Sequence, residues 1–261
     1  MILLYEHPLS PYAQKVKIAL RRMGVPFDLQ RPGGIGSGAS AGDFAEGNPR
    51  MEVPFLVDGD LRIFDSTIML DYIEESFPDR TLMPAAPAAR ARVRMIEDVM
   101  DTHYEAINWG LSELRYFNRA TGAAAEALRA EAGAQIAAIQ RWLAAELGDA
   151  DWFGGAGFGR ADLCVVPFLN GSDWHGFPPV EPALAAWLAR ANALPEVAQT
   201  SAEAKETLPT IGKAYRDGKA GAFRRQYRDH RLEWMIRSGG IDVVVTGLER
   251  GDIRFTDLTR L

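Results

Sequence analysis

The character of the sequence changes between residues 81 and 89, where TLMPAAPAA combines two prolines with several small residues. Before this stretch, short β-like and helix-like runs alternate. After it, from Arg90 onward, alanine-rich segments repeat at helical spacing. Proline and small residues between two such regions are typical of a linker. The pattern predicts an α/β domain over residues 1–80, an all-α domain over 90–210, and a C-terminal extension over 211–261.

The first 80 residues predict the order βαβ-ββα. A short apolar run, Ile2–Tyr5, precedes Ser10-Pro11, a favourable N-cap followed by proline at the first helical position. Residues 26–30 indicate a second strand. Asp58-Gly59 between two apolar runs predicts a hairpin. Asp65-Ser66 then begins a second helix with apolar residues at helical spacing. This order of elements favours an α/β unit with a mixed sheet.

The extension predicts a helix through GAFRRQYRDHRLEWMIRSGG (221–240) and a possible strand at IDVVVTGL (241–248). Its segment RRQYRDHR (224–231) is basic and aromatic, a composition that also occurs in proteins that bind nucleic acid. In an acidic chain, a solvated helix face or a dimer contact is the favoured interpretation.

The composition limits the class of protein and its partners. A hydrophobic fraction of 47% and a charged fraction of 25% are typical of globular proteins, and the net charge of −6 gives no attraction to nucleic acid or anionic membrane. The single cysteine, Cys164, cannot form an intrachain disulfide. The first apolar run is too short for a signal peptide, and no run reaches the ~20 residues that span a bilayer. We therefore expect a cytoplasmic protein.

Several motif-based functions lack support. GGIGSG (33–38) has neither the spacing nor the following lysine of a phosphate-binding loop, so it predicts a loop only. No strand-turn-helix nucleophile elbow supports a hydrolase triad. We expect no metal site, because one cysteine cannot build a thiolate site and ligand spacing is absent among His7, His103, His175 and His230.

Four segments together resemble cytosolic glutathione S-transferases, in particular serine-type bacterial members. They are SPYAQKVKIAL (10–20), the long block from Asn48 to Asp79, FGRADLCVVPFL (158–169) and PALAAWLARANALPEV (182–197). The block from Asn48 is the most specific, because Asn-Pro, Val-Pro, a hairpin and an acidic-Ser pair follow in fixed order. The resemblance implies a thioredoxin-like N-terminal domain, a helical-bundle C-terminal domain, and a homodimer that uses glutathione as co-substrate.

The resemblance also implies roles for individual residues. Val53, before a cis Pro54, is expected to pair its backbone with the cysteinyl part of glutathione. Asp65 and Ser66 are expected to bind the α-amino and carboxylate groups of the γ-glutamyl end. Glu52 lies near the expected position of the glycyl carboxylate, where its negative charge calls for compensation by Arg50 or Arg31.

Ser10 is the expected catalytic residue, donating a hydrogen bond that favours the thiolate of glutathione. Tyr5 stays a second choice, because some branches of the family use a tyrosine at the end of the first strand. The second substrate is expected to be a small, apolar electrophile, whose identity the sequence does not specify. Its expected pocket is formed by Tyr12, Tyr104, Asn108 and Trp109.

Two alternatives accompany the transferase interpretation. A thiol oxidoreductase of the same fold would need a cysteine where Ser10 stands, since serine cannot form a mixed disulfide. A non-enzymatic binding or regulatory protein of this architecture stays open, with Glu52 as a feature in its favour. The resemblance has one further departure: Gly159 replaces the serine or threonine that caps the helix opposite Asp162.

Overall fold

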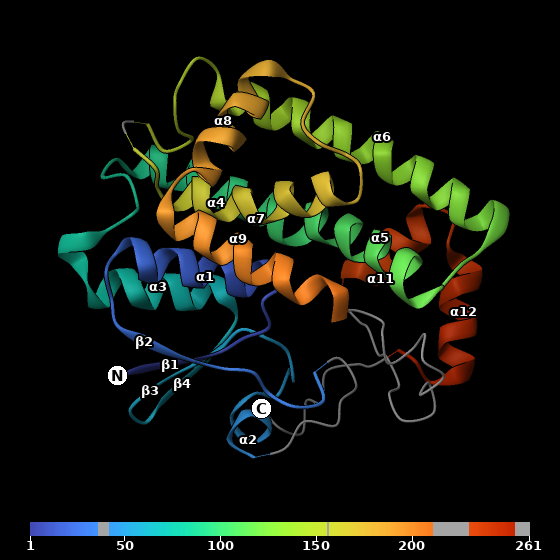
Figure 1. The fold of residues 1–261 in the computed structure, drawn as a ribbon, viewed down its shortest axis with the longest axis horizontal. Helices are drawn as coiled ribbons and strands as arrows, with labels where there is room; N and C mark the ends of the chain where they lie inside the picture. Colours follow the sequence, from blue (N-terminus) through green and yellow to red (C-terminus); the bar gives the residue numbers. More distant parts are fainter. Residues whose placement is uncertain (36–41, 156, 211–229, 254–261) are drawn as a thin grey trace. The chain divides into compact units, whose positions relative to one another are not determined.

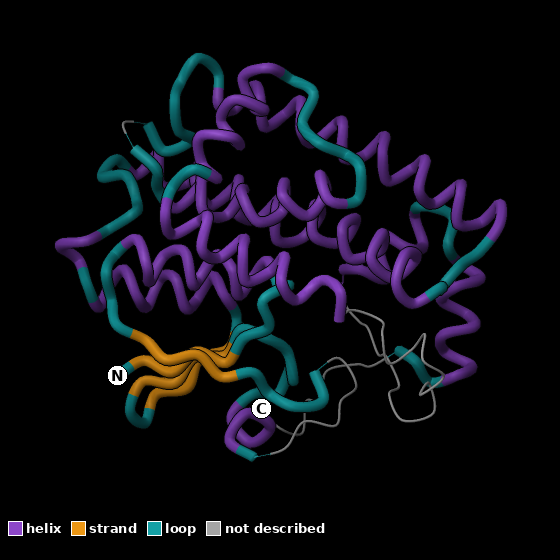
Figure 2. The backbone as a smooth tube through the Cα atoms, viewed as in Figure 1, coloured by secondary structure: helices purple, strands orange, loops and turns teal. Residues whose placement is uncertain are grey.

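The computed structural model describes residues 1–35, 42–155, 157–210 and 230–253. The described residues fall into two compact units. Unit one contains residues 1–81, 199–210 and 251–253, and unit two contains residues 82–198 and 230–250. Figure 1 shows the elements along the chain, and Figure 2 shows that strands occur together in one small sheet among many helices.

Unit one has a thioredoxin-like fold, as the family resemblance implies. Its four-stranded sheet has the order β2-β1-β3-β4. The strands are β1 (Ile2–Tyr5), β2 (Phe27–Gln30), β3 (Phe55–Asp58) and β4 (Leu61–Phe64). Strand β1 pairs in parallel with β2 and antiparallel with β3, and β3 forms the predicted hairpin with β4. Gly59 provides the hairpin turn with a φ of 58°.

Two helices lie side by side against this sheet, α1 (Pro11–Arg22) and α3 (Ser66–Ser76). A short helix that the sequence does not predict, α2 (Asp43–Gly47), lies between β2 and β3. Its Phe44 packs against Tyr5 and Phe55, with ring centroids 5.7 and 5.9 Å away. This aromatic cluster fixes the end of β1 from which the first helix is reached.

Unit two is all-α. Its main helices are α4 (Pro87–Val99), α5 (Glu105–Phe117), α6 (Gly122–Leu147), α7 (Arg160–Trp174) and α8 (Pro182–Asn192). A π-helical turn, η2 (Met100–Tyr104), joins α4 to α5. The chain then continues into α9 (Pro195–Thr207), whose residues from Gln199 onward belong to unit one. Short 3₁₀ turns lie at η1 (Pro78–Arg80) and η3 (Leu208–Thr210).

The C-terminal extension corrects one expectation. The run for which a possible strand was expected is a helix, α12 (Ile241–Arg250), which follows α11 (His230–Arg237). The predicted helix over 221–240 appears as α11, and its part before residue 230 lies outside the described residues, as does most of the basic segment. Trp234 of α11 packs on α5 so closely that a Cβ at Gly110 would lie 2.2 Å from its ring.

Candidate functional site

The turn between β1 and α1 presents Ser10 at the beginning of a helix. Ser10 is the N-cap of α1, and its Oγ accepts from the Ala13 N–H at 3.3 Å. The Ser10 N–H donates to the His7 carbonyl at 2.8 Å, and His7 Nδ1 accepts from the Leu9 N–H at 3.3 Å. His7 therefore organises the turn rather than joining a catalytic triad. The half-buried Ser10 hydroxyl lies where the helix offers unpaired N–H groups and partial positive charge.

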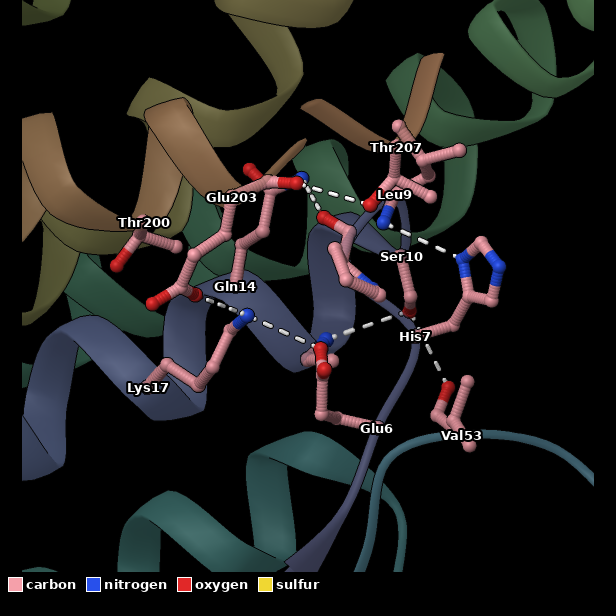
Figure 3. A network of polar contacts seen from close by, with 12 residues as sticks. Glu6, His7, Leu9, Ser10, Gln14, Lys17, Val53, Thr200, Glu203 and Thr207 are labelled. Atoms are coloured by element: carbon pink, nitrogen blue, oxygen red, sulfur yellow. Dashed lines mark hydrogen bonds and ion pairs between the residues drawn. The ribbon is translucent and has the colours of Figure 1, made fainter. Parts of the chain in front are cut away.

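The second part of the site is the loop before β3. The Val53–Pro54 peptide bond is cis, as expected. The Ser10 hydroxyl donates to the Val53 carbonyl at 3.3 Å, so the residues predicted to hold and activate the thiol lie next to each other (Figure 3). Asn48, fully buried, donates from Nδ2 to the Glu52 carbonyl at 2.6 Å and holds this loop in place.

The third part is the N-terminus of α3. Asp65, the N-cap, accepts through Oδ1 from the N–H groups of Thr67 and Ile68, at 3.0 and 3.4 Å. Ser66 is the first residue of the helix and is 5% exposed. Arg50 Nη1 donates to Asp65 Oδ2 at 2.9 Å. The arginine considered as compensation for Glu52 therefore forms an ion pair with Asp65.

A buried lysine connects the two helix N-termini. Lys15 of α1 has no exposed surface, and its Nζ lies 3.4 Å from the Thr67 hydroxyl in the first turn of α3. Its ammonium also lies 5.9 Å from the centroid of the Tyr12 ring. Because Ser10 and Ser66 each begin one of these helices, this link helps to fix their relative positions.

A second buried lysine of α1, Lys17, forms ion pairs with Glu6 and with Glu203 of α9 (Figure 3). Lys17 Nζ lies 3.0 Å from Glu6 Oε2 and 2.8 Å from Glu203 Oε2, and Glu203 also pairs with Arg21. Burial alone would raise the pKa of Glu203, but the hydrogen bonds from Lys17 and Arg21 outweigh it and hold the pKa below its ordinary value. Glu6 immediately precedes His7, so this network supports the turn that carries Ser10.

The four residues predicted for the electrophile pocket belong to two different units. Tyr12 belongs to unit one, whereas Tyr104, Asn108 and Trp109 belong to unit two. Tyr104 is fully buried, and its hydroxyl bonds to Ser172 at 2.8 Å and Gln140 at 2.9 Å. Burial raises the pKa of Tyr104 to about 12. It therefore contributes to the core of the helical unit.

Asn108 and Trp109 lie on α5 with 9% and 8% of their surface exposed. Asn108 Nδ2 donates to the Phe168 carbonyl at 2.8 Å, while its buried Oδ1 has no hydrogen-bond partner among the residues that the structure describes. Tyr12 is half-buried. Their role in binding an electrophile stays a prediction.

Tyr5, the second choice for activating the thiol, is 5% exposed and packs against Phe44 and Phe55. Its ring completes the aromatic cluster beside the sheet, with centroids 5.7 and 5.6 Å from those two neighbours. Ser10 by contrast is half-buried at a helix N-terminus. The geometry therefore favours Ser10 as the donor to a thiol.

Three findings went beyond sequence reasoning: the Arg50–Asp65 ion pair, the Lys15–Thr67 link and the Lys17–Glu203 pair. Arg50 is noticeable in the sequence because it lies two residues from Glu52, but no sequence pattern pairs it with Asp65. The two lysines had no signal, since charged residues on a helix normally predict a solvated face. Among the described residues, no three His, Cys, Asp or Glu side chains gather as metal ligands do. No helix in the described ranges has the length and apolar character required to cross a membrane.

Two family profiles match the chain. Residues 4–81 match one described as "Glutathione S-transferase, N-terminal domain", and residues 105–195 match one described as "Glutathione S-transferase, C-terminal domain". The first covers the unit-one residues of the candidate site described above, apart from Glu203 of α9.

Individual proteins show two kinds of similarity. The chain is 37% identical over 93 residues to a "Stringent starvation protein A homolog" of Coxiella burnetii, covering 36% of this chain and 43% of that protein. A homolog from Haemophilus ducreyi matches at 39% over 84 residues, or 32% of this chain and 38% of that protein. The chain thus spans less than half the length of these two relatives.

The second kind covers more of each protein. "Glutathione S-transferase U28" of Arabidopsis thaliana is 30% identical over 167 residues, which cover 62% of this chain and 68% of that protein. The crystal structure of rice GST1 in complex with glutathione superimposes with a TM-score of 0.65 and 27% identity, covering 80% of this chain and 97% of that chain.

Proposed function

Because this chain belongs to the cytosolic glutathione S-transferase family, we propose that it ionises the thiol of glutathione and directs it at a small, apolar electrophile. The supporting observation is the placement of the Ser10 hydroxyl, at the N-terminus of α1 and 3.3 Å from the carbonyl of Val53 before the cis proline. The predicted thiol-binding and thiol-activating groups lie together at this point.

In this proposal glutathione lies along unit one in an extended conformation. Its cysteinyl part pairs with the backbone of Val53, beside Pro54. Its γ-glutamyl carboxylate is held by Ser66 at the N-terminus of α3, where the helix dipole stabilises an anion. Its α-amino group approaches Asp65, and its glycyl end extends toward Glu52.

Ser10 supplies the differential stabilisation that the chemistry requires. A free thiol has a pKa near ~8.5, and lowering it by about two units takes about 2.7 kcal/mol. A hydrogen bond from the Ser10 hydroxyl to a charged sulfur contributes ~1.5–3 kcal/mol, and a helix terminus adds ~0.3–1 kcal/mol. Together these two contributions can reach about 2.7 kcal/mol, which makes the thiolate the main species at neutral pH.

The thiolate then attacks the electrophilic carbon of the second substrate. The sulfur lone pair forms the new C–S bond, and the leaving group departs with the electron pair of the bond that breaks. The predicted contributors to the electrophile pocket remain Tyr12, Tyr104, Asn108 and Trp109. Tyr104 is the weakest candidate, because it is fully buried. A homodimer and a cytoplasmic location are further expectations from the family resemblance.

The test is a pH titration of thiolate ultraviolet absorbance with glutathione bound to the wild type, Ser10→Ala and Tyr5→Phe. We expect ionisation well below pH 8 in the wild type and in Tyr5→Phe, and a return toward the free thiol pKa in Ser10→Ala. Binding of glutathione with an unshifted thiol pKa in the wild type would overturn the catalytic proposal.

A second candidate function is a non-enzymatic binding or regulatory role. The observation that favours it is the 37% identity over 93 residues to a stringent starvation protein A homolog. Glu52 adds to it, because its negative charge opposes a glycyl carboxylate. This candidate predicts that glutathione binds without a shift in thiol pKa, or that it does not bind at millimolar concentration.

A further inference from the structure

Helix α9 places a carboxylate against α1 within unit one. Glu203 Oε2 accepts from the Lys17 ammonium at 2.8 Å, and Glu203 Oε1 accepts from Arg21. Lys17 also donates to Glu6 Oε2 at 3.0 Å, and Figure 3 shows it between the two carboxylates. The four side chains form a row of alternating charges, here called the charge row, in the order Glu6, Lys17, Glu203 and Arg21.

The first member of the charge row belongs to the turn that carries Ser10. Glu6 is the residue directly after β1, and its side chain is buried against Lys17. Further along the turn, Gln14 Nε2 donates to the Pro8 carbonyl at 2.8 Å. Helix α1 therefore holds the turn at two points, once through Lys17 and once through Gln14.

The Ser10 hydroxyl depends on this support, because its own contacts are long. Its Oγ lies 3.3 Å from the Val53 carbonyl oxygen and 3.3 Å from the Ala13 nitrogen. A hydrogen bond from a hydroxyl to an oxygen usually measures about 2.5–3.0 Å. The backbone of the turn, more than these contacts, therefore sets where the hydroxyl lies, and a catalytic group has to be held within about 0.5 Å of its working position.

We propose that Glu203 of α9 is a positioning residue for the reaction, which acts through Lys17 and Glu6 to fix the turn that presents the Ser10 hydroxyl to the sulfur of glutathione. This inference rests on the proposed function, in which Ser10 is the residue that contacts the sulfur. It extends the site from the motifs of the first 80 residues to a helix near residue 200.

The burial of Lys17 explains why Glu203 matters to the turn. The Lys17 side chain has no exposed surface, and its charged partners among the described residues are Glu6 and Glu203. A buried ammonium that loses half of this compensation is unfavourable, and a lysine is long enough to turn its ammonium toward water. Without the Glu203 charge, Lys17 should therefore move and release Glu6, and the turn loses one of its two attachments to α1.

Positioning and a through-space charge effect predict shifts of opposite sign. Glu203→Gln leaves the charge row with an extra positive charge, which by itself favours the thiolate and lowers the thiol pKa. Loss of position weakens the hydrogen bond from Ser10 and raises that pKa. Arg21→Gln makes the opposite change of charge and leaves the link from Glu203 to Glu6 intact. Positioning thus predicts a raised thiol pKa in Glu203→Gln and an unchanged one in Arg21→Gln.

The experiment is the titration of thiolate absorbance with glutathione bound to the wild type, Glu203→Gln, Glu203→Asp, Arg21→Gln and Glu206→Gln. Glu206 is an exposed carboxylate of the same helix, so its variant is the matched control for the lost charge. Glu203→Gln is also combined with Ser10→Ala. Urea unfolding measures the stability of each protein. Calorimetry at about pH 5.5, below the pKa expected for the bound thiol, measures the affinity for glutathione with its thiol protonated.

We expect Glu203→Gln to raise the pKa of the bound thiol by about 1 unit, which is a 10-fold smaller ionisation constant. Glu203→Asp keeps the charge and should raise it less, and Glu206→Gln should match the wild type. Arg21→Gln should lose at least as much stability as Glu203→Gln, because Arg21 also donates to Thr200, yet keep the wild-type thiol pKa. The affinity at about pH 5.5 should be unchanged in Glu203→Gln, since Ser10 acts on the ionised sulfur.

The double variant tests the route. In the Ser10→Ala background, Glu203→Gln should leave the thiol pKa where Ser10→Ala alone puts it, because the effect passes through the hydroxyl. A further rise of similar size in this background means that Glu203 acts on the thiol by another route and overturns the inference.

Three other results overturn it. An unchanged or lowered thiol pKa in Glu203→Gln rules out positioning, and equal rises in Glu203→Gln and Arg21→Gln mean that any loosening of α9 from α1 has the same effect. If Glu203→Gln does not fold, Glu203→Asp takes its place, and an unchanged or lowered thiol pKa in that variant is the third such result. A wild type that fails to bind glutathione, or binds it with an unshifted thiol, removes the proposed function together with this inference. A shifted thiol in the wild type that Glu203→Gln leaves in place removes this inference alone.

Discussion

The carbonyl oxygen of Leu82 lies directly against Gly159, the N-cap of α7. A Cβ atom placed on Gly159 would be 2.8 Å from this oxygen, closer than real side chains come to a carbonyl. The same oxygen accepts from the Arg160 N–H at 2.9 Å, so it is held in place. The Gly159 N–H in turn donates to Asp162 Oδ2 at 2.9 Å. The glycine that departs from the expected serine or threonine is therefore required by the local packing.

Gly159→Ser should destabilise the protein by about 1–3 kcal/mol, the cost of inserting atoms into a tightly packed position. A better N-cap would otherwise add a few tenths of a kcal/mol. Urea unfolding measures the difference, with Gly157→Ser as control because a Cβ there meets no atom within 4 Å. A serine variant at least as stable as the wild type would contradict this account.

Substitutions of Ser10 should separate its capping role from its chemical role. Ser10→Ala should cost about 1 kcal/mol of stability and Ser10→Gly only a few tenths, because glycine is a tolerable N-cap. Both lack the hydroxyl, so both should return the bound thiol to its free pKa, while Ser10→Thr should retain the shift. Thermal unfolding and thiolate absorbance give the two readouts. The idea fails if the thiol pKa follows stability across the three variants.

Lys17→Met should destabilise the protein by about 3–5 kcal/mol, because it leaves the buried carboxylate of Glu6 without its partner. The double variant Glu6→Gln, Lys17→Met should cost less, since no uncompensated charge remains between β1 and α1. Lys205→Met, at an exposed position of α9, is the control and should stay within about 0.5 kcal/mol of the wild type. Urea unfolding of all three variants makes the comparison, and a cost below about 1 kcal/mol for Lys17→Met would contradict a buried ion pair.

His175, at the end of α7, should make stability depend on pH. Burial, with Arg115 and Arg129 nearby, lowers its pKa from 6.5 to about 4. Between these values the unfolded chain binds the proton and the folded protein does not, so stability falls as the pH drops from 6.5 toward 4. The contribution is complete above pH 6.5, and about 3 kcal/mol is lost across the interval.

The measurement is the free energy of unfolding at several pH values for the wild type and His175→Gln. The variant keeps a group able to reach Ser112, whose Oγ lies 3.1 Å from His175 Nε2. The stability difference between the two proteins should shrink or reverse as the pH falls. Parallel curves would show that His175 titrates alike in the folded and unfolded states.

The sequence predicts the fold of unit one well because its signals are local. Ser10-Pro11, Asp58-Gly59 and Asp65-Ser66 each specify a cap or a turn within a few residues, and the βαβ-ββα order follows from them. The run IDVVVTGL shows the limit of such reasoning. Its β-branched residues favour a strand. In the structure it is a helix, in which Val244 and Gly247 are buried one turn apart and which packs against α11.

The site divides in the same way. Ser10, Val53, Pro54, Asp65 and Ser66 could be proposed in advance, because each belongs to a short motif, and their roles toward glutathione stay predictions. The partners that hold them could not, since the pairs Arg50–Asp65 and Lys15–Thr67 join residues 15 and 52 positions apart. Such pairs depend on how close the backbone brings two side chains, which no spacing in the chain encodes.

The longest of these pairs sets an order of events during synthesis. Lys17 and Glu203 are separated by 186 residues, so at about 5–20 residues per second the ribosome delivers Glu203 roughly 10–40 seconds after Lys17. Before Glu203 is synthesised, Lys17 of the nascent α1 can pair with Glu6 but not with Glu203. Arg21 also has to wait for Glu203. We therefore expect unit one to remain incompletely folded, and to depend on chaperones, until α9 leaves the ribosomal exit tunnel.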